Sequence, residues 1–276
     1  MKPIRRTTLP FIAAACIMAA GCSDSGESPH VLVPEADGGV PRSSVEPGDE
    51  AGLEALTTRA KAGDAQARFD LGVYYEREED YEDAVFWYTL AVEKDVIEAH
   101  ANLGRMYYEG LGVEPDAAKA AELFRVAADQ GDPVSQYNLA RLYEEGNGVE
   151  RDASEAIRLL QSSASQDNAD AQNHLGAIYY NASSPDFDQA QQWYWRAAKQ
   201  GHAHAQYNLG VMYYNGEGTP VDYQRAYVWI LLGSRGGHAL AMQSVDAVGA
   251  KLTEGQIEQA TALADDWASR LDELEP

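Results

Sequence analysis

A short motif recurs along this chain at nearly constant intervals. The stretch "QYNLARLYEEGNG" occupies residues 136–148, and "QYNLGVMYYNGEG" occupies residues 206–218. Equivalent points of the motif fall at residues 63, 95, 131, 167, 201 and 237, which are 32 to 36 residues apart. A period of this length is typical of solenoids built from stacked helix pairs. The repetition therefore predicts an all-α fold.

Each repeat has the pattern of a closely packed first helix. A Leu is followed by Gly or Ala, and a Tyr comes three residues after that. The pairs are Leu71-Gly72, Leu103-Gly104, Leu139-Ala140, Leu175-Gly176 and Leu209-Gly210. A Gly inside a helix costs about 1 kcal/mol relative to Ala. Its return at the same place predicts that a neighbouring helix approaches too closely for a side chain.

The helix ends are also marked. An Asp stands four residues before an Ala at the expected start of each second helix, namely Asp80, Asp116, Asp152, Asp186 and Asp222. Asp is a strong N-cap because its side chain accepts a hydrogen bond from a free backbone N–H. Gly110, Gly146 and Gly216 are placed to close the preceding first helices in the left-handed conformation. We therefore expect two helices in each repeat.

Residues 1–21 have the pattern of a secretory signal peptide. Lys2, Arg5 and Arg6 precede an apolar run at residues 9–20, which is too short to span a bilayer. The run leads into "AAGC", which resembles the lipobox of bacterial lipoproteins. The resemblance implies cleavage before Cys22 and lipidation of its thiol. The alternative is an ordinary signal peptide in which this Cys has no role.

Residues 22–48 predict a lipidated Cys followed by a disordered tether. Four Pro residues, with Gly and Ser between them and no aromatic residue, cannot bury enough surface to form a core. A flexible segment of this length spans roughly 30 Å. Ser23 follows the Cys, whereas an Asp at that position retains lipoproteins in the inner membrane of enteric-type bacteria. By that resemblance we expect a lipid anchor in the bacterial cell envelope, at the outer membrane facing the periplasm.

Charge and cysteine content exclude several function classes. The net charge of −23 repels nucleic-acid phosphates and anionic lipid head groups. We therefore expect no nucleic acid as a partner, and membrane contact through the N-terminal lipid alone. Cys16 leaves with the signal peptide and Cys22 carries the lipid, so no thiol remains for a disulfide, a metal or a nucleophile.

One pattern summarises the repeats: "GDAxAxxxLGxxYxxGxGVxxDxxxAxxWxxxAA", as in "GHAHAQYNLGVMYYNGEGTPVDYQRAYVWILLGS". It resembles the Sel1-like repeat, a relative of the tetratricopeptide repeat. The resemblance implies an α/α solenoid, wound as a right-handed superhelix, of about five helix pairs at residues 63–236. We expect a capping helix at residues 49–62. A sixth partial repeat and a C-terminal capping helix are expected at residues 237–276, where Thr253 and Gln256 form a capping-box pattern.

The same resemblance implies a binding face. In tetratricopeptide arrays the concave side is lined by first-helix positions two before, one before, two after and five after the Leu. The candidate partner-binding residues at these positions are Asn102, Arg105, Tyr108, Tyr137, Asn138, Arg141, His174, Tyr180, Tyr207, Asn208 and Tyr214. Such side chains could bind an extended peptide, with Tyr supplying rigid contact area. The alternative is that Asn102, Asn138 and Asn208 brace neighbouring turns, and that the second Tyr of each repeat only packs.

Enzymatic patterns are not found. His202 and His204 are two apart on an expected helix and so do not share a face. No H-E-x-x-H, G-x-S-x-G or P-loop spacing occurs in the chain. We expect no catalysis, no metal and no cofactor.

Function must therefore come from the surface, because a helical solenoid has no built-in chemistry. We expect a monomeric, envelope-anchored lipoprotein scaffold that binds an envelope protein or peptide in its concave groove, as an adaptor in an assembly or export machine. The alternative is a periplasmic lipoprotein that binds a glycan or another ligand without catalysis.

Overall fold

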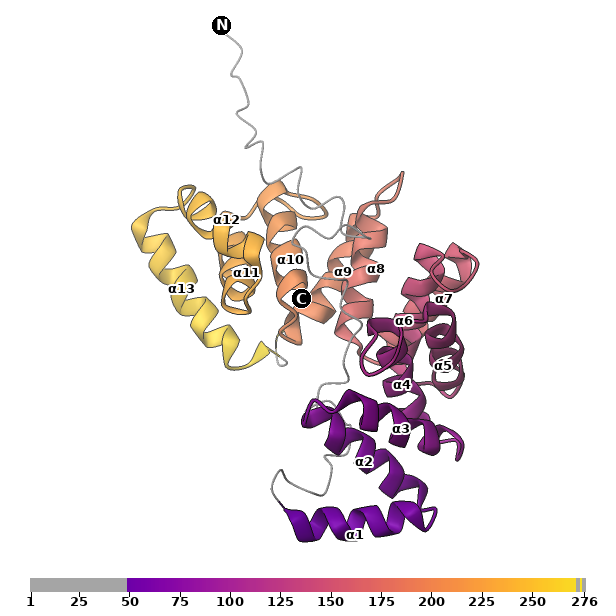
Figure 1. Cartoon of the computed structure of the whole chain (residues 1–276). Coiled ribbons are helices and arrows are strands. Elements are labelled where there is room, and N and C mark those ends of the chain that lie inside the picture. Colours follow the sequence, from indigo (N-terminus) through magenta and orange to yellow (C-terminus); the bar gives the residue numbers. More distant parts are fainter. Residues whose placement is uncertain (1–48, 272–273, 275–276) are drawn as a thin grey trace, which may run out of the picture. The chain divides into compact units, whose positions relative to one another are not determined.

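The computed structural model describes residues 49–271 and 274, and their regular structure is α-helical (Figure 1). The helices fall into two compact units, one before Asp167 and one from Asp167 onward. The first unit contains α1 (Glu50–Lys61), α2 (Ala65–Arg77), α3 (Tyr81–Val92), α4 (Ile97–Glu109), α5 (Ala117–Asp129), α6 (Pro133–Glu145) and α7 (Ala153–Ser165). The second contains α8 (Ala169–Tyr180), α9 (Phe187–Lys199), α10 (Ala203–Asn215), α11 (Tyr223–Arg235), α12 (Ala239–Gly249) and α13 (Glu254–Ala268).

Consecutive helices form the pairs that the repeat pattern predicts. In the first unit α2 packs on α3, α4 on α5 and α6 on α7, and in the second unit α8 packs on α9 and α10 on α11. Each second helix also contacts the first helix of the next pair, as α3 contacts α4 and α5 contacts α6. The all-α solenoid architecture expected from the sequence is confirmed within each unit.

The mid-helix Gly residues lie where a second helix comes very close. A Cβ atom added to Gly72 would lie 2.4 Å from the Tyr88 ring, and one added to Gly104 would lie 2.9 Å from the Phe124 ring. We call the residue that packs on this Gly the Gly-facing position. It is occupied by Tyr88 in the first repeat, Phe124 in the second, Tyr194 in the fourth and Ile230 in the fifth. The predicted close approach is confirmed.

The predicted helix ends are also present. The side chain of each expected Asp accepts a hydrogen bond from the first turn of its helix, at Asp80, Asp116, Asp152, Asp186 and Asp222. Gly110 ends α4 with a φ of 72°, in the left-handed region that favours Gly. Thr253 and Gln256 form a complete capping box at the start of α13.

The end helices cover the outermost repeats of the two units. Helix α1 packs on α2, where Leu56 and Ala60 are buried. Helix α13 packs on α11, and the Trp267 ring lies 5.0 Å from the ring of the buried Trp229. Covering the last helix pair removes its apolar face from water.

The predicted signal peptide, Cys22 and the tether lie outside the described residues. Among the residues that the structure describes, no helix is long and apolar enough to cross a membrane.

Candidate functional site

The first predicted binding positions lie between α2, α3 and α4, and two of them are buried. The side chain of Asn102 on α4 is 5% exposed. Its Nδ2 donates a hydrogen bond of 3.0 Å to the Tyr88 hydroxyl, which in turn donates one of 2.8 Å to Glu76 Oε2. Burial, followed by the neighbouring Glu76 carboxylate, raises the pKa of Tyr88, so its hydroxyl stays protonated. The Asn102 carboxamide is therefore hydrogen-bonded inside the fold.

Arg105 belongs to the same buried contact set. Its guanidinium lies 2.5 Å from Glu76 Oε1 and 3.2 Å from Glu109 Oε2, while its side chain is 4% exposed. A guanidinium held by two carboxylates in this way is not presented to solvent. The expectation that Asn102 and Arg105 form an open groove surface is corrected here, because Tyr88 accepts from Asn102 and the carboxylates of Glu76 and Glu109 hold Arg105.

The contact region between α4, α5 and α6 has the same positions as the region between α2, α3 and α4, but its hydrogen bonds differ. We call each of these regions a junction. Asn138 on α6 corresponds to Asn102 and is 3% exposed. The Gly-facing residue beside it is Phe124, which has no hydroxyl. Both Nδ2 and Oδ1 of Asn138 are buried and make no hydrogen bond. Unpaired buried polar atoms are rare in folded proteins, and each costs about 1–3 kcal/mol.

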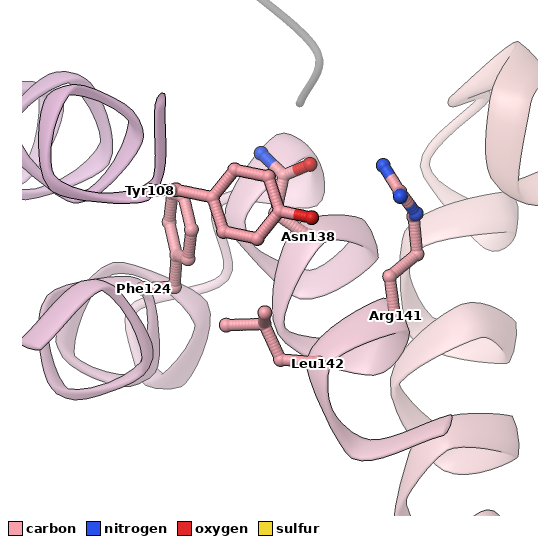
Figure 2. A pocket seen from close by; sticks show the side chains of 5 residues that line it. All are labelled: Tyr108, Phe124, Asn138, Arg141 and Leu142. Carbon is pink, nitrogen blue, oxygen red and sulfur yellow. The ribbon is translucent and has the colours of Figure 1, made fainter. Parts of the chain in front are cut away.

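Asn138 lines a small hollow with four other residues. The lining residues are Tyr108, Phe124, Asn138, Arg141 and Leu142, and they enclose about 160 Å³ of space including the open mouth. Figure 2 shows the Tyr108 hydroxyl, the Asn138 carboxamide and the Arg141 guanidinium around one space, with the Phe124 and Leu142 side chains beside it. Three of the predicted partner-binding residues are thus brought together.

The polar groups around this hollow have defined charges. Burial raises the pKa of the Tyr108 hydroxyl, although the Arg141 cation acts in the opposite direction. Arg141 lies 3.3 Å from Glu145 Oε1 with its side chain 13% exposed, so part of its charge is already balanced. Near neutral pH the hollow therefore presents a neutral hydroxyl, a neutral carboxamide and one partly paired cation.

The predicted residues of the second unit do not gather in one hollow. Tyr207 is 3% exposed and its ring lies 4.6 Å from the His238 ring, so its place on a groove surface is corrected to a packing position. Asn208 Nδ2 donates to Asn173 Oδ1 at 3.2 Å, as the bracing alternative expects. The Tyr180 hydroxyl donates to Glu217 Oε2 at 2.8 Å. The Tyr214 ring lies 5.2 Å from the Tyr223 ring.

The two remaining predicted residues, Tyr137 on α6 and His174 on α8, are partly buried in their separate units. Both take part in interactions within the fold.

A cluster of histidine rings in the second unit was not expected from the sequence. His202 caps α10 and His238 caps α12, each by accepting a backbone N–H at Nδ1 over 3.1 Å. His202 Nε2 also lies 3.2 Å from Asp170 Oδ1. The His204 ring is 4.4 Å from that of His238 and 5.7 Å from that of His202. His202 and His204 approach each other because one residue lies just before the helix and the other lies in its first turn.

Two properties of this cluster follow from its surroundings. Burial, and then the neighbouring imidazoles, lower the pKa of His238 to about 4. Burial also lowers the pKa of His204. Within the described part of the chain, no group of three or more His, Cys, Asp or Glu side chains is arranged to hold a metal ion.

Comparison with known proteins agrees with the repeat geometry. The model of the Sel1 repeat matches residues 65–96, 97–132, 133–168, 169–202 and 203–238. The chain belongs to the Sel1 repeat family. Repeats of this family generally mediate protein–protein interaction, and their scaffolds are typically non-catalytic.

Two solved Sel1 repeat structures are similar over most of this chain. A Sel1 repeat protein from Oxalobacter formigenes is 31% identical with a TM-score of 0.65, covering 71% of this chain and 59% of its own. A protective antigen present in uropathogenic Escherichia coli strains, which displays an SLR fold, is 30% identical with a TM-score of 0.68, covering 80% of this chain and 48% of its own. The chain therefore spans about half to three-fifths of the length of these relatives.

Proposed function

We propose that this Sel1 repeat protein is a lipid-anchored adaptor of the bacterial cell envelope. In this proposal Cys22 carries the lipid and residues 22–48 form the tether, at the outer membrane facing the periplasm. The helical repeats bind a segment of an envelope partner protein without catalysing a reaction. Support comes from the interaction role general to Sel1 repeats and from the lipobox-like "AAGC".

The observation that carries the partner-binding part is the hollow between α4, α5 and α6. It places an aromatic ring, a carboxamide and a guanidinium on neighbouring turns, at Tyr108, Asn138 and Arg141. Tyr and Arg are enriched at the energetic centres of protein interfaces because they combine large contact area with hydrogen bonding. A partner segment that crosses these first helices would contact Tyr108 and Arg141, and would reach the buried Asn138 carboxamide once the Tyr108 side chain turns aside.

Photo-crosslinking in cells tests partner capture at this face. A photoreactive amino acid replaces Tyr108 in one strain and Val126 in a control strain, because Val126 lies on the second helix α5 and is 42% exposed. We expect a discrete protein adduct from position 108 and none of the same mass from position 126. Equal adducts from both positions, or a glycan adduct alone from position 108, would overturn the protein-adaptor proposal.

Lipidation and location are tested separately. The full chain and a Cys22→Ser variant are expressed in a Gram-negative host that is fed labelled palmitate. We expect label in the full chain alone and recovery of that chain with outer-membrane vesicles. An unlabelled full chain found in the periplasmic fraction would contradict the anchor.

A further inference from the structure

The unpaired carboxamide of Asn138 indicates which chemical group this face binds. We propose that Asn138 binds the main chain of an extended partner segment, through the N–H and the C=O of one residue, and that Phe124 makes this site possible by withholding a hydroxyl. The inference rests on the proposed function in one respect, since it assumes that a protein chain reaches this face.

The first step is a count of hydrogen-bonding groups. A carboxamide has an acceptor oxygen and a donor nitrogen, and in Asn138 both are buried without partners. A ligand that relieves both must offer a donor and an acceptor side by side. A trans peptide bond holds its C=O and N–H on opposite edges, whereas in an extended chain the N–H and the C=O of one residue lie on the same edge. A carboxylate offers acceptors alone and an ammonium offers donors alone.

The second step is the chemistry of the surrounding walls. Phe124 and Leu142 are apolar and line the hollow together with Asn138 (Figure 2). Apolar walls lower the local dielectric, so a hydrogen bond formed there is stronger and an unpaired group is more costly. The hollow as it stands has no room for a water molecule, so a ligand reaches the Asn138 carboxamide only after a lining side chain moves. Tyr108 is partly exposed at the mouth, and its ring must turn aside to admit the ligand.

The third step is charge. Arg141 is already paired with Glu145, and the whole chain carries a net charge of −23. An anionic ligand would meet this negative field with only a partly balanced cation to hold it. A neutral amide carries no such penalty, so the electrostatics favour a peptide bond over a carboxylate.

The neighbouring junction is an internal control for the role of Phe124. Asn102 has the same place on its helix, but the hydroxyl of Tyr88 accepts its Nδ2–H at 3.0 Å. At these two junctions the Gly-facing residue therefore distinguishes an Asn that is hydrogen-bonded inside the fold from one that is not. Phe124→Tyr introduces the missing hydroxyl and is expected to close the Asn138 site with little other change.

Titration with small amides tests the inference on the purified chain. The probe is N-acetylglycine N-methylamide, a small molecule that contains the N–H and C=O of one residue, followed through the side-chain amide signals of Asn138 in ¹H–¹⁵N NMR spectra. We expect a saturable shift of the Asn138 signals and none of the Asn102 signals. N,N-dimethylacetamide, which has no N–H, should bind about fivefold more weakly because one hydrogen bond is lost. In Phe124→Tyr, N-acetylglycine N-methylamide should no longer shift the Asn138 signals.

Four results would overturn the inference. These are no saturable shift in the wild type, an unchanged shift in folded Phe124→Tyr, tighter binding of acetate, and tighter binding of N-acetylglucosamine, the last of which would indicate a sugar site. If Phe124→Tyr loses its helicity, Asn138→Leu replaces it, because it removes the carboxamide at similar volume. If position 108 gives a protein crosslink but the amide titration fails, this inference is contradicted and the adaptor proposal is unaffected.

Discussion

The two junctions of the first unit use the same positions and end in opposite states. Where α3 meets α4, Tyr88 and Glu76 supply a hydroxyl and a carboxylate that hold Asn102 and Arg105. Where α5 meets α6, Phe124 replaces the hydroxyl, and Asn138 is left without a hydrogen bond. The same repeat pattern therefore yields either an internally hydrogen-bonded junction or a candidate binding site. Which of the two forms depends on whether the fold itself supplies a hydrogen-bonding group to the Asn.

Replacing the two equivalent arginines by Ala should show the difference between the two junctions most clearly. Arg105→Ala is expected to lower the free energy of unfolding by about 2–4 kcal/mol, because it removes a buried cation from two carboxylates. Arg141→Ala should lower it by less, because Arg141 has an ion pair with Glu145 on its own helix at 3.3 Å, whereas Arg105 is held by two carboxylates. Urea unfolding followed by circular dichroism measures both. Equal losses would contradict the view that only the first junction is braced.

Removing the Tyr88 hydroxyl should convert the first junction into the state of the second. Tyr88→Phe leaves the Asn102 Nδ2 and Glu76 without their shared partner. We expect a loss of about 1–3 kcal/mol in unfolding free energy, measured by the same denaturation. Tyr75→Phe is a suitable control, since Tyr75 is a partly buried Tyr on α2 outside this contact set. A variant as stable as the wild type would show that the hydroxyl does not brace the joint.

Replacing each Asn by Leu should have effects of opposite sign. At position 138 the change removes two unpaired buried atoms, so we expect unchanged stability or a gain of about 1 kcal/mol. At position 102 it removes a hydrogen-bonded amide and should cost about 1 kcal/mol. The melting midpoints of the two variants measure these changes in stability. A clear destabilisation at position 138 would mean that its carboxamide already has a stabilising partner.

Acid should act on the second unit through its histidine cluster. The pKa of His238 is about 4 in the fold against an ordinary 6.5, so the unfolded chain takes up this proton first as pH falls. The contribution of His238 to stability is therefore complete above pH 6.5 and is lost progressively toward pH 4. Protonation also ends its role as N-cap acceptor for Ala241, and the facing groups His204, His202 and Tyr207 offer no compensating negative charge.

His238→Asn is the matched variant for this pH effect. Asn keeps a capping acceptor, as Asn168 does for α8, and removes the titrating group. We expect the variant to lose less stability than the wild type between pH 7 and pH 4, with hydrogen exchange at Ala241 as the local measure. Identical acid losses in the two proteins would assign the pH dependence to other groups, such as Asp170.

The fold could be predicted because each of its rules is local. The Leu-Gly pairs, the Asp caps and the Gly ends need only neighbouring residues, and all of them hold in the structure. The register of Asn and Arg on each first helix also predicts which face they occupy. It does not predict which side chain of another helix reaches them. For this reason four residues expected on the groove surface are buried, namely Asn102, Arg105, Asn138 and Tyr207.

Two features of the structure could not be predicted without knowing which side chains are in contact. Tyr88 and Phe124 occupy equivalent positions 36 residues apart in the sequence. The consequence of this difference becomes clear only from the hydrogen bond that Asn102 donates to the Tyr88 hydroxyl. The histidine cluster was missed because helix spacing separates His202 from His204, whereas an N-cap residue is not helical and turns its ring back toward the first turn.

The most direct test of the account is a double-mutant cycle between positions 124 and 138. Unfolding free energies are measured for the wild type, Phe124→Tyr, Asn138→Leu and the double variant. We predict a favourable coupling of about 1 kcal/mol, because the added hydroxyl stabilises the fold only when the Asn138 carboxamide is there to meet it. A coupling of zero would contradict the claim that the missing hydroxyl leaves Asn138 open to a partner.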